Sequence, residues 1–148
     1  MSSYIPAELR RLVRERADGL CEYCLVHESD SYFETEVDHI ISEKHGGQTI
    51  QENLAYACPI CNRAKGTDVG SITSPSAQFV RFFNPRTDRW SERFSLQGVN
   101  IVPKTQVGQV TARILAFNDP KRLEERGLLQ KWGRYPIESA RARITRVT

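Results

Sequence analysis

The sequence has no long apolar runs. No stretch of about 18 apolar residues occurs in the 148-residue chain, and residues 1–19 contain no apolar signal core, so neither membrane insertion nor secretion is indicated. Proline and glycine are scarce, at 7 and 9 residues, and no internal repeat is visible. These absences exclude collagen-like and low-complexity architectures. We expect a compact cytoplasmic protein with no membrane partner.

Cysteine is also scarce, but its placement is informative. All 4 cysteines fall into two C-x-x-C pairs, Cys21 with Cys24 and Cys58 with Cys61. A reducing cytosol disfavours disulfides, whereas two such pairs can supply four thiolates to one tetrahedral zinc ion. We therefore predict a structural Zn²⁺ site with no open position for substrate. Its binding would contribute on the order of 10 kcal/mol to folding.

Charge is distributed unevenly along the chain. The formal net charge is only +3, yet residues 121–148 contain 8 basic and 3 acidic residues, a net charge of +5, which leaves the first 120 residues slightly acidic. A basic tail suits a polyanionic partner, because neutralising phosphates releases counterions. Most charged stretches are simply solvated surface, so this pattern alone is weak evidence for nucleic acid.

The segment that carries the cysteines predicts a strand, strand, helix order. Apolar residues at helical spacing predict a helix over 5–18, and the β-rich run 32–41 predicts a strand or hairpin arm that ends near Asp38 and His39. Thr49 and Glu52 match a capping box, which favours a helical turn through 53–56 before Cys58. A helix over 61–66 would place Asn62 and Lys65 on one face.

The second half offers elements but no motif. Residues 67–77 are rich in small and turn-forming residues and predict a linker, and a small antiparallel ribbon is expected over 77–105. A helix should start at a Thr105 cap, a second should run from Pro120 through Leu128, and the last residues should be loose. Most large aromatic side chains here are expected in the core, namely Phe79, Phe82, Phe83, Trp90, Phe94 and Trp132.

Several short motifs between and beside the cysteines resemble the HNH endonuclease family. They read CEYC, EVDHI, GG, ENLAYACPICN and RAKG, and they cover roughly residues 9–67 in the family's order. The resemblance implies a β-hairpin and a helix that hold one divalent metal ion, with His39 activating water. Asp38 and Asn62 would bind this metal, and Asn53 would hold the loop near His39. Asn62 stands where many members have histidine, a variant the family tolerates.

The chemistry of these residue types is consistent with that resemblance. Phosphodiester hydrolysis needs a base that accepts a proton near neutral pH and positive charge at the leaving oxygen. A carboxylate and an amide oxygen are hard ligands suited to Mg²⁺ or Mn²⁺. Lys65 and Arg63 lie within a turn of Asn62 and could contact phosphates, although ordinary helix surface is an equal alternative for both.

These observations lead to an α+β protein. We predict a zinc-stapled ββα-metal module at residues 1–68 and a mixed β-ribbon and helical region at residues 69–148 that packs on it. The expected reaction is metal-dependent hydrolysis of double-stranded DNA, and by family resemblance the products would carry 5′-phosphate and 3′-hydroxyl ends. The alternatives are a zinc-dependent nucleic-acid-binding module that does not cut and a zinc-framed protein-interaction domain. The sequence leaves sequence specificity and oligomeric state open.

Overall fold

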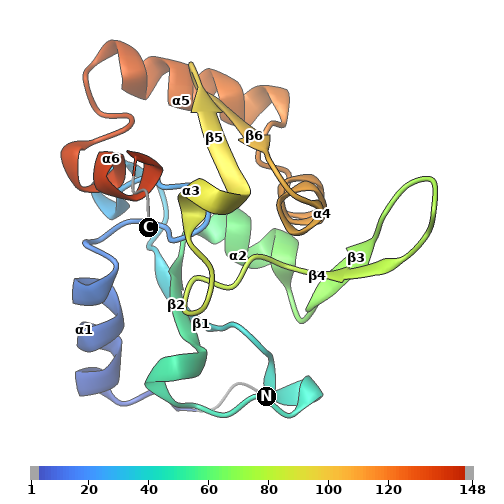
Figure 1. Cartoon of the computed structure of the whole chain (residues 1–148). Coiled ribbons are helices and arrows are strands. Elements are labelled where there is room, and N and C mark those ends of the chain that lie inside the picture. Colours follow the sequence, from blue (N-terminus) through green and yellow to red (C-terminus); the bar gives the residue numbers. More distant parts are fainter. Residues whose placement is uncertain (1–3, 146–148) are drawn as a thin grey trace.

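The computed structural model describes residues 4–145, in which three small sheets are interspersed with short helices (Figure 1). The strands pair into three two-stranded antiparallel sheets, β1–β2, β3–β4 and β5–β6. The strands are β1 Glu36–His39, β2 Leu54–Ala57, β3 Gly70–Ile72, β4 Phe79–Arg81, β5 Phe94–Gln97 and β6 Asn100–Pro103. The helices are α1 Ala7–Arg16, α2 Pro59–Lys65, α3 Trp90–Arg93, α4 Gln106–Ile114, α5 Pro120–Lys131 and α6 Glu138–Thr145. Single 3₁₀ turns occupy Glu28–Asp30, Glu43–His45 and Gln51–Asn53.

The N-terminal helix α1 confirms the helix predicted from apolar spacing. Pro6 is its N-cap, one position before the first helical residue. Gly19 has a φ of +71° and its N–H donates to Arg14 O at 3.1 Å, so it helps to end the helix as expected. The predicted strand at 32–41 is shorter, because only the four residues of β1 pair with a partner.

Strand β2 corrects the predicted helical turn at 53–56. After a single 3₁₀ turn, Leu54–Ala57 runs antiparallel to β1 and all four residues are buried. Leu54 and Tyr56 pack in a small cluster with α1, whereas Ala55 and Ala57 belong to the main core. A strand sandwiched between two apolar clusters has no solvent-facing side, so it lacks the alternation that identifies most strands from sequence.

The second half differs from expectation at three places, and in the first of them the ribbon expected over 77–105 is the β5–β6 hairpin alone, with α3 before it and β4 paired to β3. The predicted linker 67–77 contains β3, which pairs with β4 to form a ribbon that extends away from the other elements (Figure 1). The C-terminal residues predicted to be loose form α6 up to Thr145. The Thr105 cap is confirmed, since its hydroxyl accepts from Gly108 N at 3.1 Å. The helix that starts at Pro120 is also confirmed and runs three residues longer than expected.

Both halves of the chain contribute to one core. The largest apolar cluster includes residues from Leu20 to Ala140 and contains all four cysteines. Edge-to-face contacts join Phe83, Phe94 and Phe117 within it. Of the aromatic residues expected in the core, Phe79 and Trp132 are instead exposed. None of the helices within residues 4–145 has the length and apolar character that a membrane crossing requires.

Candidate functional site

The β1–β2 hairpin carries two of the predicted catalytic residues. Asp38 and His39 are the last two residues of β1, and their partners across the hairpin are Ala55 and Leu54. Successive strand residues point to opposite faces, and His39 is only 8% exposed. The hairpin therefore holds a carboxylate and an imidazole at adjacent positions on a rigid element.

Asn53 fastens the loop that connects the two strands. Its side-chain oxygen accepts from Ile41 N at 2.9 Å, and its amide nitrogen donates to Ile41 O at 2.9 Å and to Gln48 O at 2.8 Å. Gly47 is required here because a Cβ at this position would lie only 1.7 Å from Ile41 O. The middle asparagine of the motif thus closes the loop beside His39 with its own side chain.

The imidazole of His39 has a defined partner. Its Nε2 lies 2.8 Å from the hydroxyl oxygen of Thr49, a residue that the sequence suggested only as a helix cap. A hydrogen bond to one ring nitrogen fixes the ring orientation and leaves the other nitrogen, Nδ1, for chemistry. Thr49 is therefore a site residue that sequence reasoning missed.

Lys65 lies beneath the hairpin and is 2% exposed. Its ammonium donates to His39 O at 2.9 Å and lies 3.3 Å from Asp38 Oδ2. Such a buried group cannot reach a phosphate in solution without breaking both contacts. We therefore replace the phosphate contact expected for Lys65 with a positioning role, in which it ties α2 to β1. Arg63, by contrast, is exposed on α2.

Asn62 lies on α2 opposite the hairpin. Its amide nitrogen donates to Glu36 Oε2 at 3.2 Å, so its oxygen is the atom that could bind a cation. Asp38, His39, Asn62 and Glu36 all line one open groove, which we call the His39 groove. Glu36 was also missed from sequence, although it stands two residues before Asp38 and strand periodicity places it on the same face.

The four cysteines form a compact buried cluster. Their sulfurs all lie within 4.8 Å of one another, and Cys24 Sγ is 3.7 Å from Cys58 Sγ. Four sulfurs bound to zinc at about 2.3 Å would be separated by about 3.8 Å, so the donor set fits this ion. Burial raises the pKa of the Cys21 and Cys61 thiols. A bound cation would offset that cost and keep the sulfurs ionised.

The comparison with family models assigns the segment that contains both sites. The model for HNH endonuclease matches residues 21–68. These residues form an HNH domain. The match begins at the first cysteine and includes β1, β2 and α2, together with Asp38, His39, Asn53 and Asn62. Searches of the curated proteins and of the solved structures returned no significant match.

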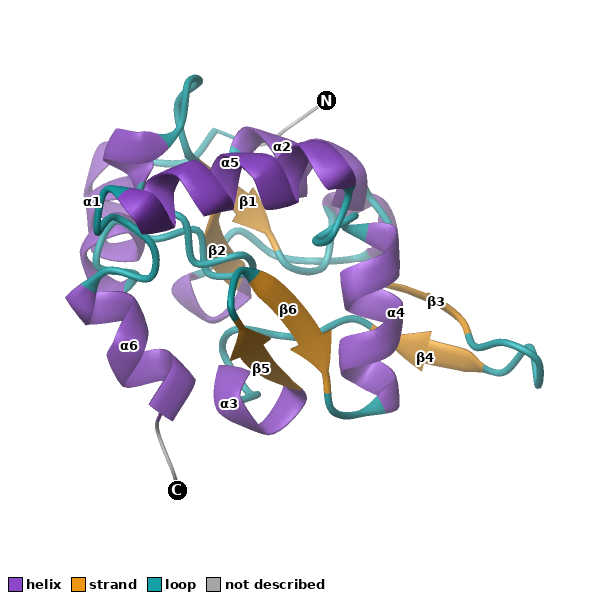
Figure 2. Cartoon of the chain, turned by 90° about the horizontal axis from the view of Figure 1, so that it is seen from above, coloured by secondary structure: helices purple, strands orange, loops and turns teal. Residues whose placement is uncertain are grey.

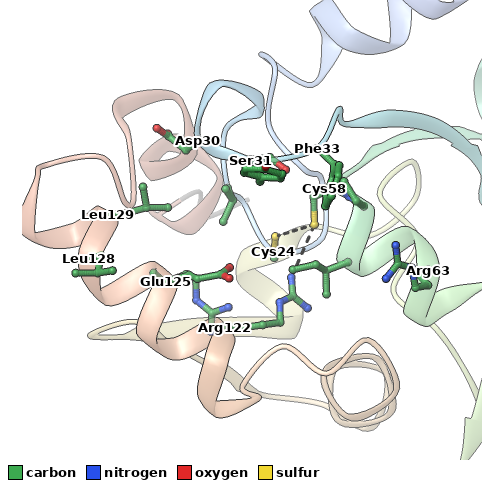
Figure 3. Close-up of a pocket in the computed structure, with 15 residues that line it drawn as sticks. Cys24, Asp30, Ser31, Phe33, Cys58, Arg63, Arg122, Glu125, Leu128 and Leu129 are labelled. Atoms are coloured by element: carbon green, nitrogen blue, oxygen red, sulfur yellow. Dashed lines mark hydrogen bonds between the residues drawn. The ribbon is translucent and has the colours of Figure 1, made fainter.

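Arg122 joins the zinc-type cluster from outside the HNH domain. In Figure 2, α5 overlies α2, and Figure 3 shows the Arg122 side chain directed from α5 at the sulfurs. Its guanidinium lies 3.2 Å from Cys61 Sγ and 3.8 Å from Cys58 Sγ, and it also donates to Leu115 O at 2.7 Å. Burial alone would lower the pKa of Arg122, but the neighbouring sulfurs raise it. The cysteine cluster thus has a permanent positive partner.

A second pocket lies between α5 and the HNH domain (Figure 3). Its walls are mostly apolar and include Phe33, Leu128 and Leu129, with Cys24 and Cys58 at its base. Arg63 lines this pocket and also a shallow one beside Asn62. None of Asp38, His39 and Asn62 lines the apolar pocket, whereas all three line the His39 groove.

Proposed function

We propose that this protein is a metal-dependent endonuclease that hydrolyses phosphodiester bonds in double-stranded DNA. The observation that carries the proposal is that Asp38, His39 and Asn62 line one groove of the HNH domain. Family membership suggests a function related to nucleic acid, and the side chains in the groove supply the groups that hydrolysis needs.

His39 acts as the general base in this proposal. With Nε2 bonded to the Thr49 hydroxyl, Nδ1 is the nitrogen free to take a proton from the attacking water. Lys65 and Asn53 hold the ends of the same strand and loop, so the imidazole is positioned before substrate binds. Preorganisation of this kind lowers the barrier because no rearrangement is needed during the reaction.

The acidic side of the groove fits a hard divalent cation. Asp38 and Glu36 offer carboxylate oxygens and Asn62 an amide oxygen, the ligand types that Mg²⁺ and Mn²⁺ prefer. A cation bound there would supply positive charge to the leaving oxygen and the non-bridging phosphate oxygens. Arg63, exposed beside Asn62, is proposed to contact a neighbouring phosphate.

The four cysteines are proposed to hold a structural zinc ion. The four cysteines are at most 5% exposed, and four protein sulfurs would complete a tetrahedral site and leave no open position for a substrate. A reducing cytoplasm would keep these thiols available for metal instead of disulfide formation. The ion would then fix β2, α2 and the loop after α1 relative to one another.

A plasmid assay tests the proposed reaction. Purified protein with Mg²⁺ or Mn²⁺ is expected to nick or linearise supercoiled DNA, and a chelator should stop it. His39→Ala should lower the rate by at least about 100-fold, because general bases contribute about that much or more. His45→Ala is the matched control, since His45 is an exposed histidine in the loop that follows β1.

The same assay separates the alternatives. If wild-type protein binds DNA with a steep salt dependence and never cuts it, the non-cleaving nucleic-acid-binding module is the better description. If it neither binds nor cuts, a zinc-framed interaction domain takes its place. Cleavage that survives in His39→Ala at the wild-type rate would contradict the assigned base.

A further inference from the structure

The basic residues of the C-terminal region do not form the open positive surface that their sequence suggests. Within the described residues 121–145, four arginines hydrogen-bond inside the protein, and Arg146 lies outside the described residues. The four are Arg122 with Leu115 O and Cys61 Sγ, Arg126 with Val99 O, Arg134 with Asp30, and Arg143 with Arg16 O. These four side chains are already paired within the protein, so this region offers fewer basic groups to phosphate than its sequence suggests.

Helix α1 supplies such a surface. Arg10, Arg11 and Arg14 line the His39 groove together with Asp38, His39 and Asn62. Arg14 is four residues from Arg10 and three from Arg11, so it is a surface neighbour of both, and Arg10 and Arg14 are about 6 Å apart along the helix axis. One wall of the groove is therefore basic and the opposite wall carries the candidate catalytic residues.

This basic wall is held rigidly against the hairpin. Arg16, at the end of α1, donates to Gln51 O at 3.0 Å and to Leu54 O at 2.8 Å. Arg14 Nε donates to Glu28 Oε2 at 2.9 Å, and Glu28 Oε1 accepts from Tyr56 OH at 2.7 Å. Burial and this hydrogen bond raise the pKa of Tyr56 to about 12, so the tyrosine stays a donor near neutral pH. The helix and β2 thus move as one unit.

The charges that line the groove nearly cancel, so a phosphate anion needs further positive charge at the acidic wall, which a bound cation would supply. The three arginines face three carboxylates, Glu34, Glu36 and Asp38, and Asp38 is already paired with Lys65. Guanidinium groups bind phosphate through paired N–H donors, whereas carboxylates repel it. A strand of nucleic acid would therefore lie along α1, with one phosphate turned toward the acidic wall and its cation.

We propose that Arg10, Arg11 and Arg14 form the phosphate-binding wall of the groove and hold the backbone of a DNA strand next to His39. The inference rests on the proposed function for its geometry, but it concerns binding, which can be measured without cleavage. It assigns the DNA contact to α1, before the HNH domain in sequence, and not to the basic C-terminal region.

Arg11 offers the cleanest test, because it is exposed and none of the interactions described above depends on its side chain. Binding of a fluorescein-labelled duplex is measured by anisotropy in the His39→Ala background, in Ca²⁺ and in chelator, across a salt series. Arg11→Ala is expected to weaken binding about tenfold and to reduce the slope of log K against log salt by about 0.9, the effect of one lost phosphate contact. In the protein that keeps Arg11, Ca²⁺ should tighten binding of the duplex relative to chelator.

Arg141→Ala provides the matched control, since Arg141 is an exposed arginine on α6, and Arg11→Lys should retain most of the affinity. Equal thermal melts confirm that both alanine variants fold. If Arg11→Ala binds as tightly as Arg141→Ala while wild-type protein still nicks plasmid, the arginine wall is wrong and the nuclease stands. If wild-type protein never nicks but binds through Arg11, the wall stands and the nuclease is wrong. A protein that binds no DNA overturns the inference outright.

Discussion

At the scale of single residues, the His39 groove depends on short polar contacts more than on exposed charge. Lys65 is the clearest case: its ammonium is buried and satisfied by Asp38 and by the carbonyl of His39. Burying an amine is costly unless it is paired and hydrogen-bonded. Lys65, on α2, can form its ion pair with Asp38 and its hydrogen bond to His39 O only when α2 packs against β1. Its contacts therefore favour one relative position of these two elements.

Thr49 offers a residue-scale test of how His39 is oriented. Thr49→Val removes the hydroxyl that bonds Nε2 but keeps the side-chain volume, so the ring loses its orienting partner. We expect the nicking rate to fall by about 10- to 100-fold, as for other groups that orient a catalytic histidine. The free energy of unfolding should fall by only about 1 kcal/mol, the contribution of one hydrogen bond.

Thr49→Ser is the control for this expectation, because it keeps the hydroxyl and should retain most of the nicking rate. Equal rates for the valine and wild-type proteins would show that the ring is held by its packing instead.

The sequence predicted the motif residues of this site, but it did not predict the side chains that contact them. The C-x-x-C spacing and the D-H, N and N positions are local patterns, and the structure gathers Asp38, His39 and Asn62 in one groove. Thr49, Glu36 and Arg122 were missed because their roles depend on side chains 10, 26 and 61 residues away in the chain. No local pattern records the contacts of Thr49 and Arg122, whereas the two-residue spacing of Glu36 and Asp38 could have indicated Glu36.

At the scale of elements, local signals predicted the helices that begin at a recognisable cap, but they missed α6 and strands β2 and β3. The Thr105 cap and Pro120 start α4 and α5 as expected, because a cap acts on its own first turn. Strands β2 and β3 were missed because a strand is defined by its partner, and neither Leu54–Ala57 nor Gly70–Ile72 alternates polar and apolar residues. The match of Thr49 and Glu52 to a capping box was misleading for the same reason.

Asp88 fastens β4 to α3 and gives an element-scale test at low pH. It lies 2.7 Å from Arg81 and 3.2 Å from Arg93, and it accepts from Asn84 N. Burial opposes ionisation, but these hydrogen bonds outweigh it and lower the pKa of Asp88. A carboxylate with a lowered pKa contributes stability above its unfolded pKa and loses it as pH falls through the folded value.

We therefore expect Asp88→Asn to cost about 1–3 kcal/mol of unfolding free energy near neutral pH. The difference from wild type should shrink as the pH falls below the ordinary range of aspartate, about pH 4. Denaturant melts of both proteins at several pH values measure it. A stability difference that stays constant in acid would contradict the role of the ionised carboxylate.

At the scale of the whole molecule, side chains of the C-terminal region hydrogen-bond to the HNH domain and pack against it. Trp90 Nε1 donates to Tyr23 O at 2.8 Å, and Tyr135 OH donates to Cys24 O at 2.8 Å. Both acceptors belong to the first cysteine knuckle. The second half of the chain thus packs around the loop whose shape the proposed zinc ion would fix.

Chelation should accordingly unfold more than the knuckles. A zinc ion worth on the order of 10 kcal/mol exceeds or matches the stability of a typical domain, so its removal should expose buried Trp90. We expect a red shift of tryptophan emission on chelation, measured in Trp132→Phe so that the exposed Trp132 does not contribute. Metal analysis confirms that zinc has left. Unchanged emission from the zinc-free protein would show that the second half folds independently.

The position of Arg122 has a consequence for synthesis on the ribosome. A zinc ion with four thiolates carries a charge of −2, and a buried dianion needs compensating positive charge. Cys61, the last of the proposed sulfur ligands, is translated 61 residues before Arg122, whose guanidinium would neutralise it. At about 5–20 residues per second, a nascent chain would hold a metal cluster with unneutralised negative charge for several seconds. During that time water would have to solvate the sulfurs that Arg122 later contacts.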